Sequence, residues 1–222
     1  ISYLLDTENL LKPIGTGDLL SGPFVKSSPF YNHDVPVKAQ DLEQASAALE
    51  RAGYRLVGQQ WMKDGKPLTL RIATLSNLET AQDVVINLQS QLQRHGIVVE
   101  PSFLGNADWK QRVWRDHDYD IILSQWSFDR NEDIYEQFHS RGVRNFVGYA
   151  NHTVDAKLDA ARTAEDPQQK KALLREVHAL IAADNPMIFL WTLDSYSALS
   201  TKVSGVVVHP FYFFTWASDW SL

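Results

Sequence analysis

Residues 68–104, "LTLRIATLSNLETAQDVVINLQSQLQRHGIVVEPSFL", decide the fold. Two apolar runs, 68–75 and 97–104, flank a segment with helical periodicity over 79–95, and Gly96 stops that helix. A strand, a helix and a second strand of these lengths predict a βαβ unit, whose strands are parallel and whose crossover is right-handed. The apolar face of the helix is formed by Ala81, Val84, Val85, Leu88 and Leu92.

The flanking sequence extends this unit into a larger α/β structure. Asp41 is placed to cap a helix that runs to Ala52 and ends at Gly53. Asp64-Gly65 predicts a hairpin turn between 56–62 and 68–75. We further expect helices over 1–12, 107–115, 133–140, 155–164 and 167–184, strands over 119–126, 185–193 and 195–201, and a long ordered loop over 13–40.

The segment 119–126, "YDIILSQW", is apolar on both faces, which is typical of a central parallel strand. Parallel strands connected by helices, together with hairpins, predict the fold class α/β, with a mixed sheet flanked by helices in one lobe. Nothing repeats along the chain, and we find no low-complexity segment.

Composition excludes several functions. The 222 residues are 44% hydrophobic, and 21 basic against 27 acidic residues give a net charge of −6 without a basic cluster, which argues against a nucleic-acid partner. The absence of cysteine excludes disulfides, thiolate metal sites and cysteine nucleophiles. The chain starts "ISYLLDTENLL", without a basic segment or a long apolar run, so we expect it to be part of a longer protein.

Signatures of catalysis or metal binding are weak. Four acids lie close together, Asp129, Glu132, Asp133 and Glu136, and a pair of them could act as acid and base on a glycoside. The simpler interpretation is charge that complements a helix N-terminus. The seven histidines show no metal-ligand spacing, and no nucleophile motif or phosphate-binding loop is present, so no cofactor is expected.

The strongest binding signal is "SQWSFDRNED" over 124–133. The predicted strand delivers Trp126 and Phe128 to its carboxyl end, where ligands collect in α/β sheets, and Asp129 follows directly. A partly desolvated carboxylate beside an aromatic wall favours an ammonium group. The alternative is a strand that simply ends in a polar turn.

A series of segments along almost the whole chain resembles the substrate-binding proteins of ABC importers for peptides and nickel, known as family 5 extracellular solute-binding proteins. The matching segments, in order, are "LLDTENLL" (4–11), "GPFVKSSPFYN" (22–32), "ASAALERAGY" (45–54), "DGKPLTLRI" (64–72), "LQSQLQRHGIVVE" (88–100), "WKQRVWRDHDYD" (109–120), "NFVGYANHTVDAKLDAAR" (145–162) and "ALLREVHALIAADNPMIFLW" (172–191).

The resemblance implies a lobe of the type II periplasmic-binding-protein kind. Residues 1–222 would form the single C-terminal lobe of a two-lobed protein, whose first lobe and signal sequence precede Ile1. Residues 205–222 would return toward that first lobe. Family members close their two lobes around a ligand like a hinge.

The resemblance also implies roles for individual residues. Asp129 would bind the α-ammonium of a peptide, Trp126 would form the wall beside Phe128, and the backbones of Gln125 and Ser127 would pair with the peptide as an added strand. The chain departs from the family pattern in having Asp133 where proline is usual. Further pocket neighbours expected from the match are Tyr31, Trp109, Asn145 and Tyr149.

The implied function is capture of a peptide or another small amine-bearing ligand and its delivery to an ABC permease in the inner membrane. The protein would be periplasmic, or lipid-anchored outside the cell, and would not be an enzyme. Three alternatives remain: the ligand-sensing lobe of a transcriptional regulator, a carrier of nickel or a metal chelate, and a carboxylate-dependent hydrolase that uses Asp129 and Glu132.

Overall fold

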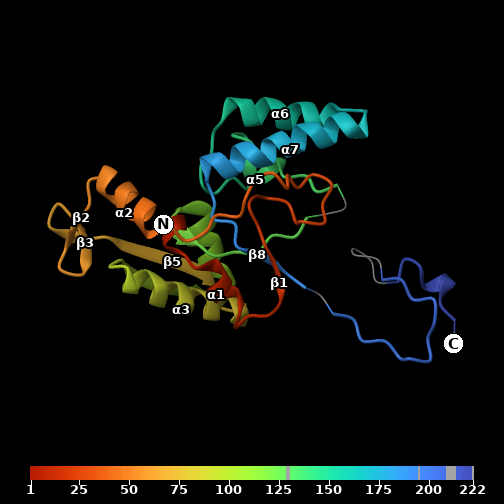
Figure 1. The fold of residues 1–222 in the computed structure, drawn as a ribbon, viewed down its shortest axis with the longest axis horizontal. Helices are drawn as coiled ribbons and strands as arrows, with labels where there is room; N and C mark the ends of the chain where they lie inside the picture. The colour runs from red at the N-terminus through yellow and green to blue at the C-terminus, as the bar shows by residue number, and fades with distance from the viewer. Residues whose placement is uncertain (129–130, 195, 209–213, 222) are drawn as a thin grey trace.

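The computed structural model describes residues 1–128, 131–194, 196–208 and 214–221. It shows the predicted α/β fold: a part built on strands, a layer of helices beside it, and a C-terminal segment that extends away from both (Figure 1). The α-helices of the described residues are α1 (Thr7–Leu11), α2 (Leu42–Arg51), α3 (Glu79–Arg94), α4 (Asn106–Trp109), α5 (Tyr135–Phe138), α6 (His152–Thr163) and α7 (Pro167–Asp184), and a π-helical segment (Lys110–Arg115) continues α4. The strands are β1 (Gly17–Leu19), β2 (Arg55–Val57), β3 (Gln60–Lys63), β4 (Lys66–Pro67), β5 (Thr69–Leu75), β6 (Val98–Leu104), β7 (Ile121–Ile122) and β8 (Trp191–Leu193).

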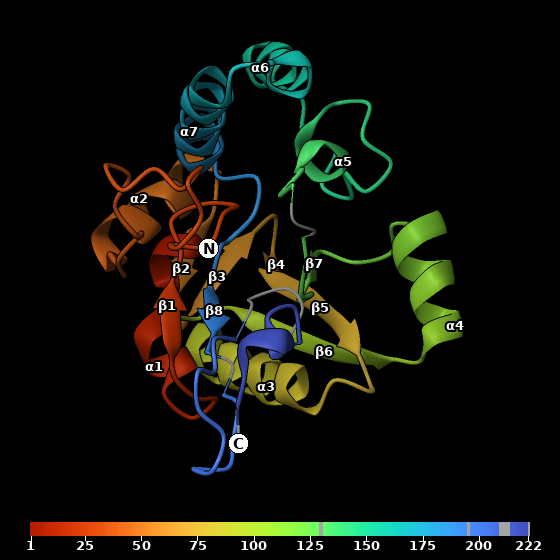
Figure 2. The same cartoon turned by 90° about the vertical axis from the view of Figure 1, so that its right-hand side faces the viewer.

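The predicted βαβ unit is confirmed as β5–α3–β6. The two strands are parallel over their whole length, with Leu70 opposite Val99, and Gly96 takes the φ of +80° that lets the helix end there. α3 covers one face of this sheet and buries Val85 completely (Figure 2). The strand order is β6-β5-β7, which places β7 at an edge.

The expected central strand over 119–126 is therefore corrected to a two-residue edge strand. Ile121 and Ile122 pair with β5 in parallel, and both are half-buried. Leu123 still donates its backbone N–H to the carbonyl of Ala73 at 2.9 Å, but the ladder ends there. In the described part of the chain β7 pairs with β5 alone, because no other strand lies along its second edge.

The turn at Asp64-Gly65 forms as predicted, with both residues at positive φ, 51° and 74°. It joins β3 to the short β4, however, and not to residues 68–75 as expected. β2 pairs with the other edge of β3, so the segment predicted as one strand is itself a hairpin. The backbone leaves this small sheet after Pro67, because β5 finds its partners in β6 and β7.

Cap residues explain where the longer helices begin. Asp41 accepts the N–H of Gln44 at the start of α2, and Asp166 accepts the N–H groups of Gln168 and Gln169 at the start of α7. The expected helix over 1–12 is broken into a 3-10 turn (Ser2–Leu4) and α1. The break follows from Asp6, whose side chain caps α1 by accepting the N–H of Asn9 at 3.0 Å.

The described residues form two large apolar cores and a smaller cluster. One core lies between α3, the sheet and the N-terminal residues; the other lies under α6 and α7, where Ile134, Val177 and Ile181 are fully buried. The smaller cluster joins Ala73 of the sheet to Trp109. The expected long loop over 13–40 is ordered and contains β1, which pairs antiparallel with β8. From this loop Phe24 enters the second core, so the loop ties the two parts together.

The C-terminal part of the chain contains fewer strand residues than the sequence predicted. The expected strand over 185–193 is reduced to β8, and residues 196–201 form no strand. A bridge between Ser204 and Ser221 closes the C-terminal segment on itself, and this segment lies apart from the rest of the molecule (Figure 1). None of the helices in the described ranges combines the length and the apolar character that crossing a bilayer requires.

Candidate functional site

The residues that follow β7 form the centre of the candidate site. Gln125 and Ser127 are exposed, whereas Trp126 and Phe128 are half-buried. This alternation is what an extended backbone produces, because successive side chains point to opposite sides. Asp129, the predicted ammonium ligand, lies outside the described residues.

Trp126 is the end of a row of three aromatic rings. Its ring stacks on Phe146, with centroids 6.1 Å apart and ring planes inclined by 26°. Phe146 in turn contacts Trp114 at 5.6 Å and 38°. Trp114 keeps 53% of its surface exposed, so the row reaches the molecular surface. Sequence reasoning missed Trp114 and Phe146 as parts of this site, because the three rings come from segments that no spacing rule connects.

Asn145 fixes the turn that presents Phe146. Its side-chain oxygen accepts the N–H of Tyr149 at 2.9 Å, and its amide nitrogen donates to the carbonyls of Tyr149 at 2.7 Å and His139 at 3.2 Å. All of its hydrogen-bonding atoms are thereby used within the protein. The predicted pocket neighbour is thus placed as a support for the aromatic row.

Replacing Asn145 with alanine is expected to destabilise the protein by about 1–3 kcal/mol, because the part-buried N–H and carbonyl of Tyr149 lose their partner and the carbonyl of His139 loses one of two. Urea denaturation followed by circular dichroism measures the effect. The control is Asn77→Ala, which replaces an exposed asparagine in the turn after β5. Equal stability of Asn145→Ala and the parent protein would contradict the supporting role.

Tyr149 is also held within the protein. Its hydroxyl donates to the Asp184 carboxylate at 2.6 Å, and burial, reinforced by this hydrogen bond, raises the pKa of Tyr149 well above its usual value. Two other predicted pocket neighbours lie in the apolar interior. Trp109 packs beside Ala73 in the sheet core, and Tyr31 lies in the core under α7. Both are buried, so their positions do not support the expected contact with a ligand.

Two of the acids that follow Asp129, namely Asp133 and Glu136, make contacts within the protein. The Asp133 carboxylate accepts the N–H of Tyr135 at 3.0 Å and forms an ion pair with Arg162 at 2.6 Å. Glu136 accepts the N–H of Val143 at 3.0 Å. The Arg162 guanidinium also lies 3.7 Å from the centre of the Tyr135 ring. These contacts favour the helix-start interpretation for Asp133 and Glu136 over a catalytic one.

A metal site was one of the alternatives left open by the sequence. Over the described ranges, no group of three or more histidine, aspartate or glutamate side chains is arranged to hold a metal ion. Among the histidines that the structure describes, His139 and His178 are the buried ones, and each lies in the helical layer.

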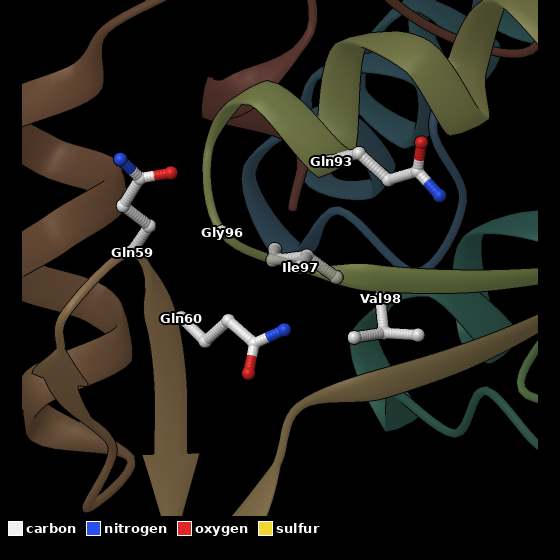
Figure 3. Close-up of a pocket in the computed structure, with 6 residues that line it drawn as sticks. All are labelled: Gln59, Gln60, Gln93, Gly96, Ile97 and Val98. Carbon is white, nitrogen blue, oxygen red and sulfur yellow. The ribbon is translucent and has the colours of Figure 1, made fainter.

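Two hollows are present elsewhere. One, of about 280 Å³, lies between the β2–β3 hairpin and the end of α3 (Figure 3). Its three glutamines do not converge: Gln60 points toward Val98, whereas Gln59 and Gln93 point in other directions. The second, of about 680 Å³, lies along α1, β1 and residues 37–40. Neither hollow is lined by a residue that the sequence predicted for the site.

The amino-acid sequence is similar to that of a family of known proteins. Residues 1–144 match the family model described as "Bacterial extracellular solute-binding proteins, family 5 Middle". Among curated proteins, the chain is 25% identical over 223 residues to the oligopeptide-binding protein AppA of Bacillus subtilis, covering 95% of this chain and 40% of the relative. It is 24% identical to the probable D,D-dipeptide-binding periplasmic protein DdpA of Escherichia coli, with coverages of 95% and 40%.

Solved structures show the same fold. The Bacillus subtilis AppA complex with a nonapeptide superposes with a TM-score of 0.82 at 24% identity, over 100% of this chain and 46% of that one. NikA from Brucella suis with Fe(III)-EDTA gives a TM-score of 0.74 at 18% identity, over 86% of this chain and 40% of that one. The chain therefore spans less than half the length of these relatives.

Proposed function

Because the chain belongs to the family 5 bacterial extracellular solute-binding proteins, we propose that it is the ligand-binding lobe of the substrate-binding component of an ABC importer. It captures a peptide-like ligand in a cleft between two lobes and delivers it to the membrane permease. The proposal is supported by the family match over residues 1–144 and by the relatives named for oligopeptide and dipeptide binding. The family name describes binding proteins outside the cytoplasm, which supports a periplasmic or lipid-anchored location and no enzymatic reaction.

The second lobe of the cleft comes, in this proposal, from residues that precede Ile1 in a longer chain. The chain covers 40% of the length of AppA and DdpA, which leaves room for such a lobe in those relatives. Residues 205–222 are the segment that returns toward it. In support, the described part of this segment lies apart from both cores and exposes Val207 and Phe214.

One observation carries the ligand site: Trp126 lies beyond the carboxyl end of a parallel edge strand, with its ring stacked on Phe146. The second edge of β7 has no partner strand among the described residues, which supports pairing of the backbone beyond it with an added peptide strand. Gln125 and Ser127 supply those backbones, and Phe128 continues the apolar wall. Asp129 follows directly and takes the α-ammonium of the peptide.

Asp129→Asn is expected to weaken the binding of tripeptides with a free amino group by about ten- to a hundredfold, because a charge-assisted hydrogen bond is lost where water is excluded. The same peptides with an acetylated amino group are expected to bind both forms equally. Isothermal titration on the protein as its gene encodes it, with any residues before Ile1 retained, measures both affinities.

The matched control is Asp133→Asn, an acid four residues away whose carboxylate is already paired with Arg162. It is expected to leave the discrimination between free and acetylated peptides intact. Equal loss of both ligands in Asp129→Asn would contradict the ammonium role, and no tripeptide binding by the parent protein would contradict the proposed function.

A further inference from the structure

The aromatic row has a property that the proposed function does not require. Its middle ring, Phe146, belongs to a turn that is fixed on both sides. The N–H of Phe146 donates to the carbonyl of Arg144 at 2.9 Å, and its own carbonyl accepts the hydroxyl of Tyr119 at 2.9 Å. Burial raises the pKa of Tyr119, which keeps this hydroxyl protonated as a donor. With Asn145 holding the same turn, Phe146 is a rigid support.

Trp126, in contrast, receives little support from its own backbone. It lies beyond the last residue pair of β7, Ala73 opposite Ile122, and the residues between them form no further ladder. The near-parallel ring of Phe146 is the aromatic contact of Trp126 in the described part of the chain. Among the described residues, Phe146 is therefore the ring against which the indole of Trp126 stacks.

We infer that Phe146 is a positioning residue that fixes the ring plane of Trp126, and that the row Trp114–Phe146–Trp126 makes the site select peptides with an aromatic side chain. This inference rests on the proposed function, because it requires a peptide at the end of β7. The row presents flat apolar faces, and the half-buried Trp126 and exposed Trp114 leave ring surface to be covered. An aromatic side chain covers such a surface in offset-stacked geometry, whereas a branched aliphatic one does not.

The size of the selection follows from the stacking energy. Aromatic pairs gain about 0.5–1.5 kcal/mol beyond their area burial, which corresponds to roughly two- to twelvefold in affinity. A ring held in one plane by Phe146 delivers this gain without first losing rotamer freedom. A ring released from that support retains its apolar area but loses the preference for a flat partner.

The test uses the protein as its gene encodes it and two series of tripeptides. One series places phenylalanine at each position of Ala-Ala-Ala in turn, and the other places leucine there. Isothermal titration of the parent protein is expected to show, for at least one position, a three- to tenfold tighter binding of the phenylalanine peptide than of the leucine peptide. Phe146→Leu is expected to bring that ratio below about twofold, and the conservative Phe146→Tyr is expected to restore it.

Thermal unfolding of each variant checks that it is folded, and Trp126→Leu provides a second route to the same loss of preference if Phe146→Leu does not fold. A phenylalanine-to-leucine ratio near one in the parent protein would overturn the inference while tripeptide binding itself upholds the proposed function. A ratio that Phe146→Leu leaves unchanged would also overturn it, since a merely structural phenylalanine lowers the affinity for both series alike.

Discussion

Phe24→Ala is expected to destabilise the protein by about 3–5 kcal/mol, the cost of removing a large ring from a packed core. Only 1% of the Phe24 side chain is exposed. Its ring lies 5.6 Å from Phe30 and 6.1 Å from the imidazole of His178. The cavity left by alanine would open between the loop and α7, so the loop over 13–40 should loosen together with the helical layer.

Urea denaturation followed by far-ultraviolet circular dichroism measures this loss. The matched control is Phe103→Ala on β6, where the ring is 39% exposed and less apolar surface leaves water on folding. We expect the control to cost less than half as much. If both substitutions cost the same, the loop would not contribute to the core as its burial indicates.

The loop shows how far sequence reasoning reaches. Its many turn residues predict the absence of long helices and strands, and that prediction is confirmed apart from β1. What keeps the loop ordered is invisible in the sequence, because it depends on Phe24 and Tyr31 meeting α7 about 150 residues later. Local composition describes a segment, whereas burial is decided by its distant partners.

Several helix ends were predicted correctly from capping residues and periodicity, because these depend on interactions between residues close together in the sequence. Asp41, Asp166 and Gly96 act within a few residues of themselves, so α2, α7 and the end of α3 are placed correctly from the sequence. The strand over 119–126 failed because an apolar run does not reveal how many neighbours a strand will have. With β5 as its partner in the described part of the chain, β7 is short.

The candidate site also combines features that the sequence predicts with features that it does not. That Trp126 follows an apolar strand segment could be predicted, although β7 ends at Ile122 and not at Trp126 as expected. The fate of other aromatic residues could not: Trp109 became core, whereas Trp114, five residues later on the same helical stretch, became surface. The surrounding fold, and not the local sequence, decides which of these two rings faces inward.

Acidification is expected to weaken the fold through His178, which is fully buried on α7. Its Nε2 shares a hydrogen bond with the hydroxyl of Ser21 at 3.0 Å, and Ser21 shares another with Tyr31 at 2.8 Å. The Nδ1 atom has no hydrogen-bond partner among the described residues. Burial, with a smaller effect of nearby His33, lowers the pKa of His178 from 6.5 to about 4.

The direction of the pH effect follows from where each state takes up its proton. The unfolded chain protonates this imidazole near pH 6.5, whereas the folded protein does so only near pH 4. Between these values the unfolded state binds more protons, so the free energy of unfolding falls as the pH is lowered from 6.5 to 4, by up to about 3 kcal/mol. Above pH 6.5 both states are neutral at this residue and the effect vanishes.

Urea denaturation of the parent protein and of His178→Gln at intervals between pH 7 and pH 4 separates this residue from all others that titrate. The glutamine variant is expected to be less stable at pH 7, because the packing around Ser21 and Phe24 is disturbed. Its stability should also fall less steeply with acid, by up to about 1.4 kcal/mol per pH unit, since one proton fewer is taken up on unfolding. A fully buried imidazole with an unpartnered nitrogen resists protonation, so the two curves should differ in slope. Parallel curves for the two proteins would contradict the prediction, because His178 would then titrate normally in the folded protein.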